Sequence, residues 1–271
     1  MTNPAGHAHG PGGLYAEENH HQLDEGDSAH IDESGQTFKV QGDKKTQLKE
    51  ASSKSDPSKP TSPGPGWVSF ASWTPTADIT RLSGSWVVPE PPAKNQLEIV
   101  FLHIGLQGKS AGQTVFAPIV LQWGKTPYGG GDYWAIACWL QAGSNILVGN
   151  YEQVETGDTI QAEVVHTEDG DVRRLSMKGT NGSKTATLDF SLSAPLEDEL
   201  AYGGVLEAYA VDMKCSQYPA QQSVTFNDLT VESADGPLDP TWKINDEVQD
   251  CGQQTQIVAA GEVEIFFRGS S

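Results

Sequence analysis

The sequence predicts an all-β protein, because short apolar runs alternate with turn residues and no long stretch keeps a helical period. From Trp67 onward, runs rich in β-branched and aromatic residues recur about every ten residues. Clusters of Gly, Asn, Asp and Pro between them predict tight connections. An amphipathic helix would instead repeat apolar residues every 3.6 positions. Many short strands of this kind are typical of an antiparallel β-sandwich or barrel.

The expected strands fill one domain, residues 67–271, since nothing indicates a second core. In chain order they are residues 82–88, 97–104, 116–123, 133–140, 159–165, 175–178, 186–192, 205–211, 223–231 and 263–267.

Residues 1–66 have a different composition, with sparse and aperiodic apolar side chains and a Pro/Ser-rich end at residues 52–66. A segment of this kind buries too little surface to offset its ordering entropy, so we expect a disordered N-terminal arm and linker. Four of its histidines could bind a metal ion weakly, but a solvated tail is the stronger expectation. These histidines are His7, His9, His20 and His21.

The chain of 271 residues carries a net charge of -19. This charge argues against nucleic acid and anionic membranes as partners, because like charges repel. No run of about 18 apolar residues predicts a transmembrane helix. The N-terminus lacks an apolar core, so we expect no secretory signal and interpret the chain as written as intracellular. The pattern indicates no oligomeric state.

Two polar residues stand within apolar strands, Gln122 in residues 118–124 and Glu207 in residues 203–211. An amide and an acid at such positions are costly to bury unless they have partners. Alternation places Val120 and Gln122 on one face of their strand, and Glu207 and Tyr209 on one face of theirs. If the two strands are neighbours, the pair could hold and activate a water molecule.

The chemistry of the two side chains suits that role. A carboxylate among apolar neighbours is partly desolvated, which favours proton acceptance by Glu207. The Gln122 amide can donate to a developing oxyanion and accept from the attacking water. The alternative is structural, with Gln122 satisfying backbone groups and Glu207 pairing with a cation.

Further residues are candidates for a cleft on the same sheet. His103 and Gln107 lie where a strand runs into a Gly-containing segment, and His103 could act as an acid or a base, although a structural histidine is the more common case. We expect aromatic side chains to line a groove that holds a polypeptide or a small molecule. These candidates are Trp123, Trp134, Trp139 and Tyr209.

The three cysteines show no zinc-site spacing, and no metal or cofactor is expected. Cys138 lies in an apolar strand and is interpreted as a buried thiol, with His103 as the only possible partner for a Cys/His pair. Cys215 and Cys251 lie in turn-rich sequence and could bridge in an oxidising compartment.

Five short segments resemble the fungal glutamic peptidases, also called eqolisins or family G1. The resemblance covers roughly residues 78 to 232. Residues 121–124 (LQWG) are similar to the Leu-Gln-Thr-Gly that carries that family's catalytic glutamine, and residues 206–211 (LEAYAV) to the segment that carries its catalytic glutamate. The other three are residues 81–89 (RLSGSWVVP), 102–108 (LHIGLQG) and 223–228 (SVTFND).

The resemblance implies a concanavalin A-like sandwich and an endopeptidase that works at acid pH. Glu207 would activate water and Gln122 would stabilise the tetrahedral intermediate. His103 stands where that family has a Trp, and Gln107 where it has an Asp. The segment 132–139 also lacks the glutamate that the family places in its cleft. The family is secreted, whereas this sequence shows no signal.

These observations favour a glutamic-peptidase-like hydrolase with a Gln122/Glu207 dyad. One alternative is a diverged enzyme on the same fold, with His103 and Glu207 as an acid-base pair acting on a small molecule or a glycan. The other is a lectin-like module without catalysis, which binds carbohydrate on the aromatic face.

Overall fold

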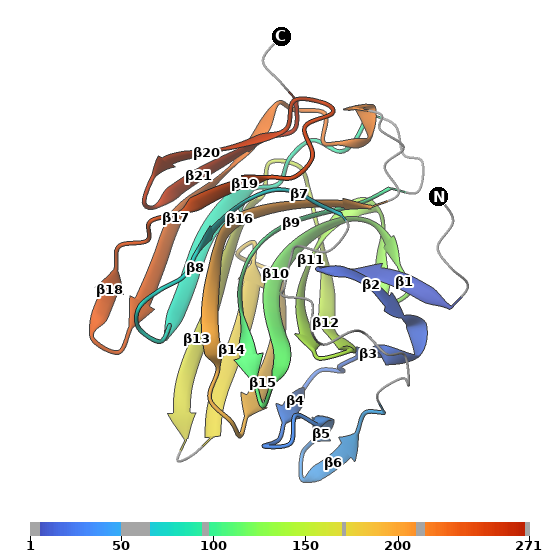
Figure 1. Ribbon diagram of the computed structural model, residues 1–271. Helices are drawn as coiled ribbons and strands as arrows, with labels where there is room; N and C mark the ends of the chain where they lie inside the picture. The colour runs from blue at the N-terminus through green and yellow to red at the C-terminus, as the bar shows by residue number, and fades with distance from the viewer. Residues whose placement is uncertain (1–5, 50–65, 94–97, 170–171, 210–214, 269–271) are drawn as a thin grey trace.

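The computed structural model describes residues 6–49, 66–93, 98–169, 172–209 and 215–268. Within these ranges the chain forms β-strands and two single turns of 3-10 helix, and no α-helix. Two antiparallel-dominated sheets pack face to face, which confirms the predicted β-sandwich (Figure 1). No helix of the described residues is long and apolar enough to span a bilayer.

One layer is a curved sheet of eight strands in the described part of the chain. Its order is β19 (Lys243–Asp246), β7 (Trp67–Trp73), β16 (Glu197–Tyr209), β9 (Ile99–Ser110), β10 (Gln113–Thr126), β11 (Gly129–Ala142), β12 (Asn145–Val154) and β3 (His20–Gln22). The central strands of this sheet carry both members of the expected dyad, since β9 lies between β16 and β10.

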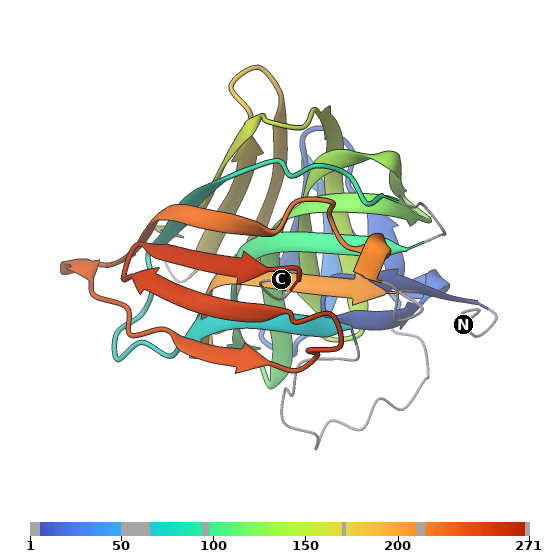
Figure 2. The same ribbon diagram turned by 90° about the horizontal axis from the view of Figure 1, so that it is seen from above.

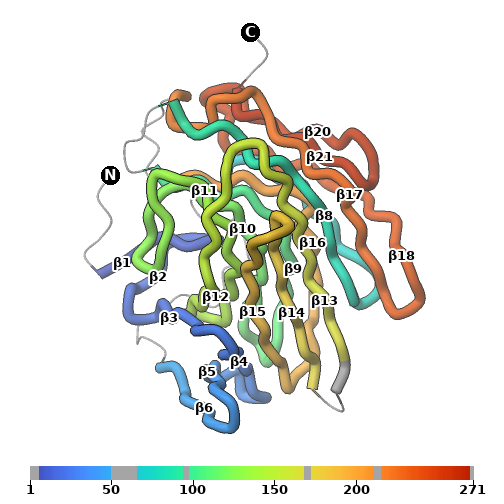
Figure 3. Tube along the Cα trace, turned by 180° about the vertical axis from the view of Figure 1, so that it is seen from behind, coloured from blue at the N-terminus to red at the C-terminus, as the bar shows by residue number. Residues whose placement is uncertain are grey.

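The second layer has eleven strands among the described residues, and its strands β13, β14 and β15 face the viewer in Figure 3, which shows the molecule from behind. Its order is β20 (Gln254–Ala259), β21 (Glu262–Phe266), β17 (Ser223–Ser233), β8 (Arg81–Val87), β13 (Thr159–Asp169), β14 (Val172–Thr180), β15 (Thr185–Leu192), β4 (Asp27–Ile31), β5 (Thr37–Gln41) and β6 (Lys44–Gln47), with β18 (Gly236–Leu238) on β17. The C-terminal strands β20 and β21 lie at one end of the sandwich and are nearest the viewer in Figure 2.

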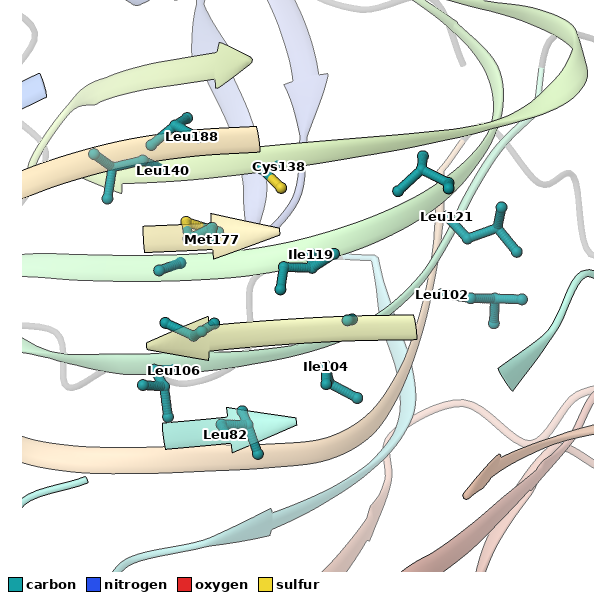
Figure 4. Close-up of a cluster of buried hydrophobic side chains, with 14 of the residues drawn as sticks. Leu82, Leu102, Ile104, Leu106, Ile119, Leu121, Cys138, Leu140, Met177 and Leu188 are labelled. Atoms are coloured by element: carbon teal, nitrogen blue, oxygen red, sulfur yellow. The ribbon is translucent and has the colours of Figure 1, made fainter. Parts of the chain in front are cut away.

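The core between the layers is built from the side chains that alternation assigned to one face. Ile119 and Leu121 of β10 and Cys138 of β11 point towards the second sheet, where they meet Met177 and Leu188 (Figure 4). Gly179 of β14 leaves space there, because a Cβ at this position would lie 2.8 Å from Cγ2 of Ile119. The side chains of β10 therefore pack directly against the backbone of β14 at this position.

The N-terminal part differs from the expectation of disorder, which is wrong for residues 6–49. Strands β1 (His7–Gly10) and β2 (Gly13–Ala16) form a hairpin, β3 pairs in parallel with β12, and β4 pairs in parallel with β15. Few apolar side chains suffice because these strands extend the edges of sheets that already exist. Residues 50–65 of the expected linker lie outside the described residues.

The disulfide left open by the sequence is present, since Cys215 and Cys251 are bonded to each other. Their separation of 36 residues joins the segment after β16 to the loop before β20. Cys138 is a free, buried thiol, as predicted.

We predict that Ile119→Ala lowers the free energy of unfolding by about 3 kcal/mol, because it opens a cavity in a fully buried layer. Urea denaturation followed by tryptophan fluorescence measures this change. Val87→Ala is the matched control, since Val87 is 46% exposed and should change stability by less than about 0.5 kcal/mol. Equal losses in the two variants would contradict the packing described for Ile119.

Candidate active site

The strand registers bring Gln122 and Glu207 to the same face of the curved sheet. Gln122 of β10 lies opposite Phe101 of β9, and Glu207 of β16 lies opposite the same Phe101 from the other side. Residues directly opposed on antiparallel neighbours point to one face. With strands about 4.8 Å apart, the two Cα atoms are about 10 Å from each other. The side chains therefore flank the ring of Phe101.

Glu207 is fully buried and is held by three donors. Nε2 of His103 lies 2.7 Å from its Oε1, and the Tyr209 hydroxyl donates to Oε2 at 2.8 Å. The backbone N–H of Gly12, in the β1–β2 turn, donates to the same Oε2 at 2.9 Å. Charge-assisted hydrogen bonds of this kind offset the loss of hydration of a buried carboxylate.

Aromatic rings surround the Glu207 carboxylate. The rings of Trp67 and Phe116 pack edge-on against His103, with centroids 5.8 and 5.7 Å away. Burial and then the Glu207 charge raise the pKa of Tyr209 well above its usual range. Tyr209 therefore remains a neutral hydroxyl, and thus a donor to Glu207, at acid and neutral pH.

Gln122 is also fully buried, and its amide is engaged with the β10–β11 turn. Its Nε2 donates to the carbonyls of Gly124 at 2.9 Å and Gly129 at 3.3 Å, and its Oε1 accepts from the Tyr151 hydroxyl at 3.4 Å. Gly130 has a φ of +85°, and a Cβ there would lie 2.3 Å from Nε2 of Gln122. The turn can hold the amide only because this residue is a glycine.

The two candidate catalytic groups thus share a face, but their hydrogen bonds go to different partners. Among the described residues, Glu207 is hydrogen-bonded to His103, Tyr209 and Gly12. Gln122 is hydrogen-bonded to the β10–β11 turn and to Tyr151. The arrangement meets the requirement of a common face.

The expected cleft residues divide between the two faces. Trp139 and Tyr209 lie on the face of Gln122 and Glu207, in a cluster with Phe101. Trp123 and Trp134 lie in the core between the sheets, with ring centroids 5.5 Å apart, so the expectation that they line the cleft is wrong. The physical reason is strand alternation, which turns Trp123 away from the face of Gln122.

Gln107 lies on the same strand and face as His103, farther along β9. Its Oε1 accepts a hydrogen bond of 2.9 Å from the hydroxyl of Tyr202 on β16. Burial raises the pKa of Tyr202, and the charge of Glu207 raises it further. Gln107 is therefore tied to the aromatic wall that flanks His103.

Sequence reasoning missed the N-terminal hairpin as part of this site. His9 stacks on Tyr209 with ring centroids 4.3 Å apart, and the Tyr15 hydroxyl donates to the side chain of Gln141. A signal was present, because Pro11-Gly12-Gly13 is a turn sequence between two short runs. The low apolar content of the segment nevertheless led to the prediction of disorder rather than of a hairpin.

Cys138 takes no part in the site. Its Sγ–H donates to the Ala186 carbonyl at 3.4 Å on the core face, away from His103. A Cys/His pair between them is therefore excluded. In the described ranges, no group of three or more His, Cys, Asp or Glu side chains is arranged to hold a metal ion.

The sequence profile of the Peptidase A4 family matches residues 66–265. No curated protein matches the chain. Among solved structures, scytalido-glutamic peptidase with a peptide-based transition-state analogue matches with a TM-score of 0.49 at 16% identity, over 74% of this chain and 97% of that chain. SCP-B, an eqolisin in complex with the tripeptide Ala-Ile-His, matches with a TM-score of 0.49 at 15% identity over the same shares.

The profile match covers well over half of the 271 residues, and the chain therefore belongs to the Peptidase A4 family, the eqolisins or glutamic peptidases. The resemblance found in the sequence motifs is confirmed.

We predict that Cys138 resists alkylation by iodoacetamide in the native protein, because burial raises the pKa of its thiol and hides the sulfur. Mass spectrometry should find the residue unmodified at neutral pH and modified in denaturant. Rapid native labelling would contradict its placement between the sheets.

Proposed function

We propose that this chain is a hydrolase of the glutamic-peptidase type, with Glu207 as general base and Gln122 as the group that stabilises the oxyanion. We propose a polypeptide as the substrate, because the chain belongs to a peptidase family. The resemblance of the motifs favours an acid pH for the reaction. Proton transfer by a side chain is most effective when its pKa lies near the working pH.

The proposed reaction begins with a water molecule on Glu207. The Glu207 carboxylate takes one proton from this water as its oxygen attacks the carbonyl carbon of the peptide bond. Gln122 then turns the N–H that it gives to the Gly129 carbonyl, the longer of its two bonds at 3.3 Å, towards the substrate carbonyl oxygen, which carries negative charge in the tetrahedral intermediate. The intermediate collapses when the proton on Glu207 passes to the leaving nitrogen and the C–N bond breaks.

The single observation that carries this proposal is the shared position of both side chains opposite Phe101. An amide and an acid on one sheet face, about 10 Å apart at their Cα atoms, can reach a water or a carbonyl placed between them. The fully buried Glu207, surrounded by donors, supports a role as a prepared base rather than a solvated surface acid.

We predict that Glu207→Gln abolishes cleavage of an unfolded protein substrate at about pH 3 to 4, by more than a thousandfold, because an amide cannot accept the proton from water. Gln122→Ala should reduce the rate by about a hundredfold or more through loss of the oxyanion donor. The cleavage rate is measured from the amino groups that hydrolysis releases.

Glu163→Gln is the control, since Glu163 lies on the second sheet and pairs with Arg81. It should keep wild-type activity. A wild-type chain that cleaves no peptide at any pH between about 2 and 8, even with the N-terminal hairpin displaced, would refute the proposal.

A second candidate function is favoured by one distance, the 2.7 Å between Nε2 of His103 and Oε1 of Glu207. Both side chains are fully buried, and a His–Glu pair is a common acid-base unit. Such a pair would act on a small molecule or a glycan, with most activity near neutral pH.

The two functions are separated by His103→Gln, which keeps a hydrogen-bond donor beside Glu207 but removes the titrating ring. Under the leading proposal, we predict that acid cleavage of peptide stays within about tenfold of wild type. Under the second, hydrolysis of nitrophenyl glycosides or esters near neutral pH would fall by about a hundredfold or more. Rates measured across the pH range for both substrate classes decide between them.

A further inference from the structure

The N-terminal hairpin lies on the candidate active-site face and contacts its central acid. The turn residue Gly12 gives its N–H to Glu207, and His9 stacks on Tyr209. Gly10 lies against Trp139 and Ile146, since an added Cβ would be in van der Waals contact with the Trp139 ring, at 3.4 Å. The hairpin therefore occupies the place where a substrate backbone would have to lie to meet Glu207.

No sheet ladder holds the hairpin in this place. Within the described residues, β1 and β2 pair only with each other, and β3 is the first strand that joins the large sheet (Figure 1). A two-stranded hairpin is marginally stable by itself. Its position thus depends on side-chain contacts and on the bond to Glu207, and it can leave without breaking either sheet.

Two histidines supply much of that contact. The ring of His20 stacks on Tyr128 at 5.2 Å and meets Tyr15 edge-on at 5.9 Å, and the side chain is 5% exposed. Burial, and then the charge of His21, lower the pKa of His20 to about 4, although hydrogen bonds to the backbones of Ala8 and Tyr15 partly oppose the shift. Burial also lowers the pKa of His9.

The groups that face these rings are mostly uncharged at working pH. Tyr209 and the carboxylate of Glu207 face His9 from β16, and Tyr15 lies on its own hairpin. Tyr128 faces His20 from the β10–β11 turn, while His21 bonds to Asn145 and feels the charge of Lys39. Two carboxylates near these rings carry charge in the described part of the chain: Glu207, whose Oε2 accepts from the Gly12 N–H, and Glu17, whose charge acts on Tyr128 beside His20.

The sign of the pH effect follows from these shifts. A histidine whose pKa is lowered in the docked state contributes its full stabilisation above its ordinary value of 6.5 and loses it as the pH falls towards 4. In that window the state with the hairpin detached binds protons, at His9 on β1 and at His20 on β3, that the docked state cannot accept. Acidification therefore favours detachment.

We propose that residues 7–16 of this chain are the resident occupant of the active-site face and leave it when His9 and His20 become protonated. At neutral pH the hairpin blocks Glu207, and at acid pH it uncovers that carboxylate. The block on catalysis rests on the proposed function, whereas the docking and release of the hairpin do not.

The test follows hydrogen exchange of the peptide that covers residues 7–16, by mass spectrometry of the full chain at pH values from about 7 to 4. Protection is expressed relative to the denatured chain at each pH. In wild type, protection should fall by about a hundredfold across this window, since each pKa unit is worth a factor of ten. The peptide from β9 should stay protected.

The double variant His9→Phe with His20→Phe keeps both ring contacts but cannot take up protons there. Its hairpin should lose less than about threefold in protection over the same window. In each single variant, the protection of the hairpin should fall by about tenfold over this window, between the values of wild type and the double variant. If the double variant fails to fold, the single variants test the proposal.

Two further variants complete the experiment. Gly12→Pro removes the N–H that binds Glu207 and conflicts with the φ of +88°, so its hairpin should be unprotected already at pH 7. His30→Phe is the matched control, because His30 is also buried and has a pKa lowered by burial, but it lies on β4. It should behave as wild type.

A wild-type hairpin that stays protected at pH 4, or a double variant that releases it as wild type does, overturns the proposal. Peptide cleavage measured in the same samples separates the two ideas. Release without any cleavage leaves the switch standing and refutes the proposed function. Cleavage while the hairpin remains protected refutes the switch and keeps the proposed function.

Discussion

The antiparallel register of β16, β9 and β10 at Phe101 determines where the candidate active site of this protein lies. Glu207 and Gln122 are placed by backbone ladders on either side of one buried ring, not by loops. A shift of one residue in either ladder would turn one of the two side chains into the core between the sheets. Because the opposite face is filled with Leu102, Leu121 and Leu206, such a shift is strongly disfavoured.

A fully buried acid on that face needs donors, and the way it obtains them explains the N-terminal segment. His103 and Tyr209 each supply one hydrogen bond, from the sheet itself. The third comes from Gly12, at the tip of a hairpin about 195 positions away in the chain. The first strands are thus part of the resting site, since they complete the solvation of Glu207 and cover the aromatic cluster around Phe101.

Strand alternation in the sequence was enough to predict the sandwich and the faces of its central strands. It placed Val120 with Gln122 and Glu207 with Tyr209, as the structure has them. The error with Trp123 and Trp134 came from choosing residues by type, although the same alternation sets Trp123 opposite to Gln122. The sequence named Cys215 and Cys251 as the pair that could bridge, but not whether they do, because that depends on the redox state of the compartment.

The N-terminal strands escaped prediction for a different physical reason. Amino-acid composition indicates whether a segment can form a hydrophobic core of its own. The N-terminal segment has too few apolar residues to do so. Strands β3 and β4 need no such core, because β12 and β15 offer unpaired edges to which a polar strand can bond through its backbone. The residue pattern of one sequence does not show which strand edges remain unpaired. The docking of the hairpin on Glu207 could therefore not be predicted either.

The donors of Glu207 differ in how firmly they are held, and the two states proposed for the site rest on this difference. His103 and Tyr209 are fixed in β9 and β16, whereas Gly12 is carried by a hairpin that pairs with neither sheet in the described part of the chain. When the hairpin leaves, Oε1 keeps His103, and Oε2 keeps Tyr209 but loses one donor. A water molecule that takes the place of the Gly12 nitrogen would lie 2.9 Å from Oε2, on the exposed side of a carboxylate already fixed in orientation. That is the position from which a general base removes a proton, so the bond that closes the resting site also marks where the attacking water would bind.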